Sequence, residues 1–340
     1  MKLSTIFLTL LAALAAVSAQ AAEDAGLRFI RSRGYVICGT DLSSKTLAYK
    51  DEDGIWSGID ADICRNFAAA VLGNDEAFRL KDVSADQAAQ ALNSNQIDIM
   101  LGNSTLSARQ EAASPAAAMD VLYYDKQVFA ARNDSGATSM EAFKGAKVCV
   151  QDKSVDLASL NEYNHKYAME FNILTFPNMN AAKQAFYLNR CPLIAGSEIY
   201  LKGLSRNLVL KNNTITVLPE IIAYRPIYAY SAKSNPSLRI IGKWILNAPK
   251  LAEQQGITSK NSEAFIGVRD SSLQNLLGLD AGLWQAFGLK PDWAGKALKL
   301  RGNFGEMFER NLGKDSPLQI ERDKNYLIEK GGLINALPFI

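Results

Sequence analysis

The first third of the chain alternates between short apolar runs and longer helical segments. Three runs are short and rich in β-branched or aliphatic residues, which indicates strands: residues 35–39, 79–83 and 97–101. Helices are predicted between them over 59–72 and 85–93, and Gly73 provides a C-terminal stop for the first helix. Strands that alternate with helices favour an α/β unit with a mainly parallel sheet.

The same alternation returns after residue 145. Strands are predicted at 146–150, 173–176 and 193–195, with further extended segments at 215–219 and 227–231. Helices are predicted to start at Val155 and to cover 180–189. From Leu238 onward the chain is mainly helical, with a last helix near 302–312. The pattern therefore predicts two α/β lobes, of which the first is interrupted by the second, joined by extended segments near 125–131 and 221–229.

The N-terminus has the pattern of a secretory signal peptide. One positive charge at Lys2 precedes a mostly apolar run to Val17, and residues 18–21 carry an A-x-A cleavage pattern. We expect residues 1–21 to be removed. The first cysteine is Cys38, so no cysteine lies at the cleavage site to carry a lipid, and the mature chain is expected to be unanchored.

Composition restricts the class of partner. The chain has 37 basic and 35 acidic residues and a net charge of +2, with no basic block that would favour nucleic acid. The proportions of charged and hydrophobic residues, 21% and 48%, are typical of a globular protein. A metal site is not expected, because no C-x-x-C spacing occurs and the single histidine, His165, lies in a polar helical stretch predicted to be on the surface. No cofactor is expected.

Four cysteines in an exported chain indicate two disulfides, for which three connectivities exist. The alternative is four buried thiols. We predict the pairs Cys38–Cys64 and Cys149–Cys191, because each pair joins elements of the same α/β unit.

One polar stretch carries candidate binding chemistry. The sequence GNSTLSARQ, residues 102–110, follows the apolar strand 97–101. Its Asn103, Ser104, Thr105 and Arg109 are hydrogen-bond donors suited to an anion such as a carboxylate. The alternative is that Arg109 is a solvated helix residue.

The chain resembles periplasmic substrate-binding proteins of amino-acid ABC transporters, and most of all their general L-amino-acid-binding branch. The matching stretches are YVICG at 35–39, WSGIDADICR at 56–65, KVCVQ at 147–151, LPEII at 218–222 and GNFGEMFERN at 302–311. SPL at 316–318 and KGG at 330–332 extend the match almost to the C-terminus, and all four cysteines are included.

The resemblance implies a fold and an organisation. The fold is an α/β, two-lobed, periplasmic-binding-protein-like clamp of type II with a helical C-terminal extension, which closes around its ligand at a hinge. It implies a first lobe of residues 22–127 plus 226–340 and a second lobe of 128–225. It also implies a periplasmic location.

The resemblance further implies positions for ligand contacts. Asn103, Ser104 and Thr105 would lie at the wall of the cleft, and Arg109 would anchor the ligand's carboxylate. In the second lobe, Ser154 would cap a helix whose amide N–H groups face the same ligand.

The sequence departs from the family at the position that holds the ligand's ammonium group. The family commonly places an aspartate there, whereas this chain has Ser197 followed by Glu198. Either Glu198 takes this role, or the ligand is not a standard α-amino acid, or Glu198 simply faces water. The loop after Gly39 also differs, and it offers Tyr49 for stacking and Asp41 for a polar contact.

The leading hypothesis is a non-enzymatic binding protein that delivers a small polar, carboxylate-bearing solute to a membrane permease, most simply as a monomer. The alternatives are a ligand-sensing or degenerate adaptor clamp and a periplasmic dehydratase-like enzyme on the same scaffold. The enzyme would need a positioned acid or base, and the sequence has no G-x-S-x-G, H-E-x-x-H or Cys/His pairing.

Overall fold

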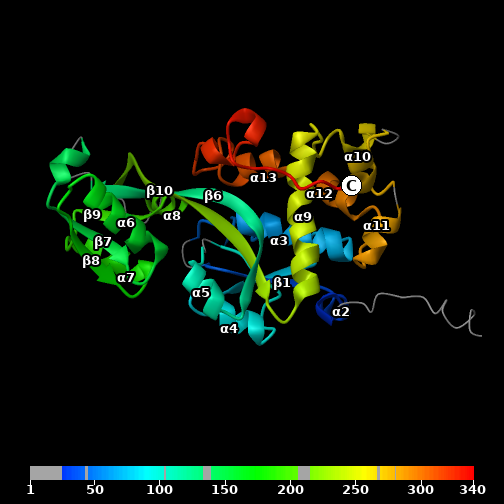
Figure 1. Ribbon diagram of the computed structural model, residues 1–340, viewed down its shortest axis with the longest axis horizontal. Helices are drawn as coiled ribbons and strands as arrows, with labels where there is room; N and C mark the ends of the chain where they lie inside the picture. The colour runs from blue at the N-terminus through cyan, green and yellow to red at the C-terminus, as the bar shows by residue number, and fades with distance from the viewer. Residues whose placement is uncertain are drawn as a thin grey trace, which may run out of the picture.

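The computed structural model describes residues 25–42, 45–102, 105–132, 139–205, 215–265, 269–279 and 281–340. Within them, the chain forms two α/β lobes placed side by side and crossed by one mixed sheet, as Figure 1 shows. The strand order is β4-β1-β5-β10-β6-β9-β7-β8. The signal-peptide segment 1–21 lies outside the described residues.

The first lobe contains the parallel strands of the N-terminal segment: β1 (Val36–Thr40), β4 (Phe78–Asp82) and β5 (Ile99–Met100). A small hairpin of β2 (Tyr49–Lys50) and β3 (Trp56–Ser57) lies outside this sheet. The helices are α2 (Ala25–Arg33), α3 (Ile59–Leu72), α4 (Ala88–Asn93) and α5 (Ala108–Ala113). The bounds predicted for α3 are confirmed, and Gly73 ends it in the left-handed conformation at φ 74°.

The second lobe holds the parallel strands β7 (Lys147–Gln151), β8 (Asn172–Phe176) and β9 (Leu193–Ser197). Its helices are α6 (Val155–Lys166), α7 (Met179–Tyr187) and α8 (Glu198–Ser205). Two separate apolar clusters cover the two faces of this part of the sheet. Helices on both faces explain why the central residues of β7 and all residues of β9 are buried.

Two long antiparallel strands connect the lobes. They are β6 (Ala116–Arg132) and β10 (Ile215–Ala232), which pair along nearly their whole length. In one lobe β10 pairs with β5 at Tyr230, and in the other β6 pairs with β9 over 127–131. The sequence pattern indicated only parts of these strands, because charged residues such as Asp125 and Arg225 interrupt the apolar runs. Both strands therefore pass from lobe to lobe and form the hinge.

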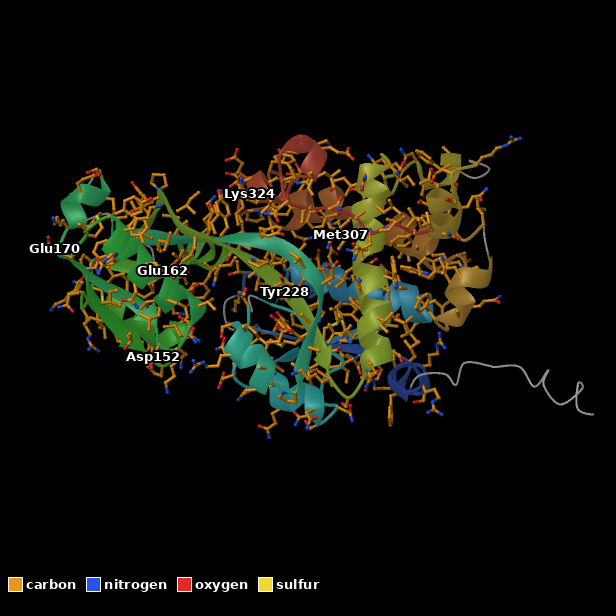
Figure 2. The ribbon with its side chains drawn as sticks, viewed as in Figure 1. Asp152, Glu162, Glu170, Tyr228, Met307 and Lys324 are labelled. Atoms are coloured by element: carbon orange, nitrogen blue, oxygen red, sulfur yellow. A yellow bond between two sulfur atoms is a disulfide. The ribbon has the colours of Figure 1, made fainter. Side chains whose placement is uncertain are left out.

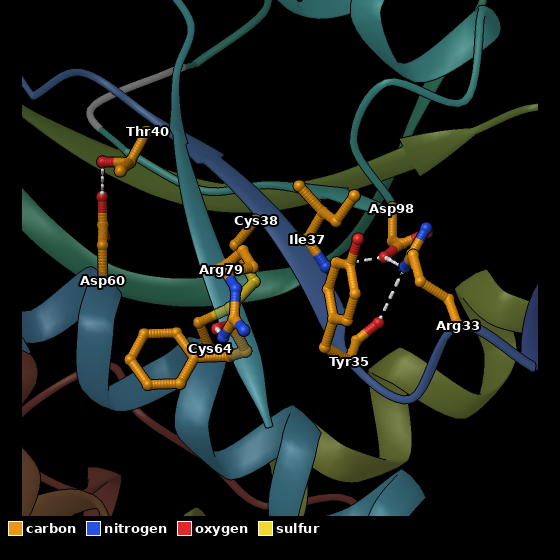
Figure 3. Close-up of a disulfide and its surroundings, with 10 residues drawn as sticks. Arg33, Tyr35, Ile37, Cys38, Thr40, Asp60, Cys64, Arg79 and Asp98 are labelled. Atoms are coloured by element: carbon orange, nitrogen blue, oxygen red, sulfur yellow. Dashed lines mark hydrogen bonds and ion pairs between the residues drawn. A yellow bond between two sulfur atoms is a disulfide. The ribbon is translucent and has the colours of Figure 1, made fainter. Parts of the chain in front are cut away.

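Both predicted disulfides are confirmed. Figure 3 shows Cys38 on β1 joined to Cys64 on α3 in the core of the first lobe. The second bridge joins Cys149 on β7 to Cys191 just before β9. Each bridge fastens elements of one lobe, so neither restrains movement of one lobe against the other.

Helix α9 (Pro236–Gln254) continues the chain from β10 and packs on α3 and β6. Pro249 lies inside it and has no N–H to donate to the carbonyl of Ile245. The amide of Asn66, on α3, donates to that carbonyl over 3.2 Å. A side chain from a neighbouring helix thus supplies the hydrogen bond that proline removes.

The C-terminal third is helical, as predicted, with α10 (Ser271–Leu277), α11 (Ala281–Ala286), α12 (Trp293–Arg301) and α13 (Phe304–Asn311). Figure 1 shows this part beside α9 and α3 of the first lobe. Asp62 on α3 is buried and bonds Arg301, Arg310 and Asn311. Burial opposes ionisation of Asp62, but the two arginines hold its pKa below the usual range. This network fixes the extension to the first lobe.

The chain after α13 returns to the hinge. Asn325 bonds both backbone groups of Tyr124 on β6, donating to the carbonyl over 2.8 Å and accepting from the N–H over 2.7 Å. The hydroxyl of Tyr224 on β10 donates to Asp323 over 2.6 Å. Figure 2 shows the neighbouring Lys324 on this C-terminal segment close to the hinge strands. The extension thus contacts both strands that connect the lobes.

Candidate functional site

Polar groups follow the carboxyl ends of parallel strands in both lobes. Thr40 and Asp41 come at the end of β1, Thr105 follows β5, Ser154 follows β7, and Ser197 ends β9. In α/β sheets, ligands bind outside the carboxyl ends of the strands. The structure therefore indicates a site between the lobes, next to β6 and β10.

The lobes are in contact beside this region. A Cβ atom added at Gly203 on α8 would lie 2.5 Å from Oγ1 of Thr46, which belongs to the loop after β1. Ile199, also on α8, is buried in the core cluster of the first lobe. Helix α8 is thus the part of the second lobe that lies against the first.

Asp60 is a buried acid of the first lobe, next to the carboxyl ends of β1 and β5. It is completely buried at the start of α3, where the hydroxyl of Thr40 and the backbone N–H of Gly102 donate to its carboxylate, as Figure 3 shows for Thr40. Its Oδ1 has no hydrogen-bond partner among the described residues. Burial raises the pKa of Asp60 to about 7, although the two donors oppose this.

A buried ion-pair cluster occupies the junction of hinge and second lobe. Arg225 on β10 donates through Nη2 to Asp125 on β6 over 2.7 Å and through Nη1 to Asp156 on α6 over 2.6 Å. All three residues are buried, and Gln127 also donates to the backbone carbonyl of Asp156 over 2.8 Å. Burial raises the pKa of Asp125, and the charge of Arg225 counteracts it. We refer to Arg225, Asp125 and Asp156 as the hinge triad.

Ser197 is engaged with its own surroundings. It is buried, its Oγ accepts the N–H of Tyr200 over 3.2 Å, and its hydroxyl is bonded to the carboxylate of Asp125. It therefore caps the first turn of α8 and supports the hinge triad.

Glu198 does not face water. Its side chain is 11% exposed and forms ion pairs with Lys202 at 3.0 Å and with Lys126 at 3.8 Å. It lines a small pocket whose other side is formed by α13 and the C-terminal segment. The structure thus pairs this carboxylate with two cations.

Ser154 occupies the N-cap of α6. Its Oγ accepts the N–H of Leu157 over 3.1 Å and its hydroxyl donates to the carbonyl of Gln151 over 2.7 Å. The preceding Lys153 has φ of 51°, a left-handed conformation that favours glycine. The turn before α6 thus keeps a glycine-like backbone while it presents an exposed lysine.

The other predicted contacts divide into four groups. Thr105 donates through its hydroxyl to the carbonyl of Pro226 on β10 over 2.6 Å. Arg109 is exposed in the first turn of α5, a helix that has no buried residue. Asp41 and Tyr49 are half-buried, and Asn103 and Ser104 lie outside the described residues.

Sequence reasoning missed Asp60 and all three members of the hinge triad. Asp60 belongs to the matched stretch WSGIDADICR, which could have drawn attention to it. No comparable sequence signal pointed to the hinge triad. Asp156 and Asp125 lie 69 and 100 residues from Arg225 in the chain, and the three meet only through the sheet.

Two α/β lobes, a two-strand hinge and polar strand ends between the lobes define a ligand-binding clamp. In the described part of the chain, no group of three histidine, cysteine or acidic side chains could hold a metal ion. None of the described helices is both long and apolar enough to cross a membrane.

The chain belongs to the bacterial extracellular solute-binding proteins, family 3, whose sequence model matches residues 36–277. It is 32% identical over 330 residues to the general L-amino acid-binding periplasmic protein AapJ of Rhizobium johnstonii, with 96% of each chain covered. It is 29% identical over 328 residues to the glutamate/glutamine/aspartate/asparagine-binding protein BztA of Rhodobacter capsulatus, covering 96% of this chain and 97% of that protein.

A solved structure is similar over nearly the whole fold. It is an ABC transporter periplasmic binding protein from Brucella ovis with glutathione bound, 29% identical to this chain. The superposition has a TM-score of 0.83 and covers 92% of this chain and 99% of that one. The two-lobed fold expected from the sequence, with its helical C-terminal part, is confirmed.

Proposed function

We propose that this protein is the periplasmic solute-binding component of an ABC importer and that it carries an amino acid or an amino-acid derivative with a free carboxylate. The observation that supports this most directly is the meeting of polar strand ends from both lobes beside a two-strand hinge. The names of AapJ and BztA, and the glutathione bound to the Brucella ovis protein, place amino acids and a small peptide among the ligands of similar proteins.

The proposed ligand site comprises seven of the residues predicted from the sequence: Asp41, Tyr49, Asn103, Ser104, Thr105, Arg109 and Ser154. Ser197 and Glu198 are not included, because Ser197 is bonded to Asp125 and Glu198 is paired with two lysines. Arg109 is the proposed carboxylate anchor, since it is exposed in the first turn of α5, which follows β5. The N-terminus of α6, capped by Ser154, would add backbone donors and a favourable helix dipole.

The lobes are proposed to move as units. Residues 22–127 with 226–340 would form one unit and 128–225 the other, in a monomeric protein without catalytic activity. Because the chain crosses the hinge twice in a paired ribbon, motion would be restricted to closure. A membrane permease would receive the solute from the closed clamp.

Thermal unfolding and small-angle scattering test this proposal. The mature protein would be screened with each standard L-amino acid and with glutathione, using glycerol and glucose as uncharged controls. A true ligand at 100 times its Kd should stabilise the fold by about 2.7 kcal/mol and reduce the radius of gyration. The proposal fails if no carboxylate-bearing compound stabilises the protein or if saturation leaves the radius unchanged.

A further inference from the structure

An amino-acid ligand brings an ammonium group as well as a carboxylate, and a buried ammonium needs a negative partner. The question of which acid supplies it rests on the function proposed above. Ser197, at the end of β9, is uncharged, and its hydroxyl is already bonded to Asp125. The partner must therefore be another residue near the carboxyl edges of the strands.

Most nearby acids are unsuitable because they are enclosed or already paired. The carboxylate of Glu198 already forms ion pairs with two lysines, and it faces the C-terminal segment. The side chain of Asp125 is 1% exposed and bonds both Arg225 and Ser197. Asp60 is completely buried, directly under Gly102, where a Cβ atom would lie 3.6 Å from Oδ2. None of these three offers an oxygen at the surface between the lobes.

Asp156 differs in position and in the pairing of its two carboxylate oxygens. It lies in the first turn of α6, two residues after the N-cap Ser154, so it is at the carboxyl edge of the second lobe's sheet. Its side chain is 8% exposed, and Arg225 is bonded to Oδ1. Arg225 does not occupy the second oxygen, Oδ2, and Oδ2 is not a fully buried oxygen without a partner. Arg225 and Gln127 hold the residue from the hinge side, which fixes its position.

The charges of the hinge triad also favour a cation. The hinge triad contains two carboxylates and one guanidinium, so it carries one net negative charge when both acids are ionised. A ligand ammonium beside Asp156 would balance that charge in a region of low dielectric, where an ion pair is strong. The ligand's carboxylate could then reach the backbone donors at the start of α6 or Arg109.

We propose that Asp156, held in place by Arg225, is the specificity-determining residue that receives the ligand's ammonium group in place of Ser197. The geometry assigns the cation contact to the first turn of α6 rather than to the end of β9. The protein is then selective for α-amino compounds over the same carboxylates without the amino group.

Calorimetry with matched ligands and matched variants tests the assignment. The probes are L-glutamate, L-glutamine and glutathione, each compared with the analogue in which hydrogen replaces the α-ammonium group. Asp156→Asn keeps the size of the side chain and one acceptor for Arg225. It should weaken binding of the amino compound about 30-fold or more and change binding of its analogue by less than about threefold. Asp152→Asn, in the same turn, is the matched control and should affect neither selectively, whereas Asp41→Asn tests a rival contact in the first lobe.

The outcomes separate this assignment from the function on which it rests. If Asp156 only supports the fold, Asp156→Asn weakens both members of a pair equally or lowers the melting temperature without loss of selectivity, and the assignment is overturned. An ammonium-selective loss in Asp41→Asn instead would move the contact to the first lobe and also overturn it. If the wild-type protein binds none of the amino compounds and none of their analogues, the proposed function fails, and the assignment fails with it.

Discussion

Replacement of Arg225 by methionine tests the hinge triad most directly. Methionine preserves much of the side-chain volume but leaves the carboxylates of Asp125 and Asp156 without their shared partner, now at 2.7 and 2.6 Å. Removal of one member of a buried ion pair typically costs about 3–5 kcal/mol, because an uncompensated buried charge remains. We therefore expect Arg225→Met to lower the free energy of unfolding by about 3–5 kcal/mol at pH 7.5.

The loss should depend on pH in a defined direction. Burial already raises the pKa of Asp125, and without Arg225 nothing would counteract it. The folded variant would then bind protons that the unfolded chain releases above a pH of about 4, so its stability falls as the pH rises. At pH 4.5 the deficit relative to wild type should be smaller than at pH 7.5, because protonation removes the buried charge.

Urea unfolding followed by far-UV circular dichroism measures both effects. Tryptophan fluorescence would be incomplete, since all four tryptophans lie outside the segment 128–225. The control is Arg239→Met, which changes an exposed arginine on α9 and should stay within about 0.5 kcal/mol of wild type. The triple variant with Asp125→Asn and Asp156→Asn should regain most of the lost stability. A loss below about 1 kcal/mol, or an equal loss at both pH values, would refute the reasoning.

Three further predictions concern the cleft and the hinge. Arg109→Ala should weaken binding of a carboxylate ligand by about 2–4 kcal/mol. Arg109→Lys should restore only part of this binding free energy, because the guanidinium fork is lost. Full affinity of the alanine variant in calorimetry would exclude Arg109 as the carboxylate anchor. Burial raises the pKa of Asp60 in the folded state to about 7, above the ordinary 3.8. Between these two pH values the stability of wild type relative to Asp60→Asn should therefore fall by about 1.4 kcal/mol per pH unit. If urea unfolding gives parallel pH profiles of stability for the two proteins, the burial argument is contradicted. Asn325→Ala removes both hydrogen bonds to the backbone of Tyr124 and should cost about 2 kcal/mol; a change within about 0.5 kcal/mol of wild type in thermal unfolding would show that water replaces the side chain.

Several local features could be predicted from the sequence, because residues close together in the chain determine them. The helix at 59–72 is defined by its composition and by Gly73, which adopts the left-handed conformation at its end. The cysteine pairs follow from the order of strands and helices, since each bridge joins a strand to an element of the same α/β unit. Ser154 was expected to cap the helix predicted to start at Val155, and the structure places it at the N-cap of that helix.

The sequence by itself therefore determined the helices, the core strands, the disulfides and the two-lobed class. Only the tertiary structure decided which polar groups meet at the hinge. Arg225 finds Asp125 because β10 pairs with β6, and it finds Asp156 because α6 packs beside them. Asn66 similarly donates to the carbonyl of Ile245, 179 positions away, which lacks its usual helical donor because of Pro249. Such partnerships depend on the order of strands in the sheet and on the packing of distant elements, and a buried charge is stable only where that packing supplies its partner.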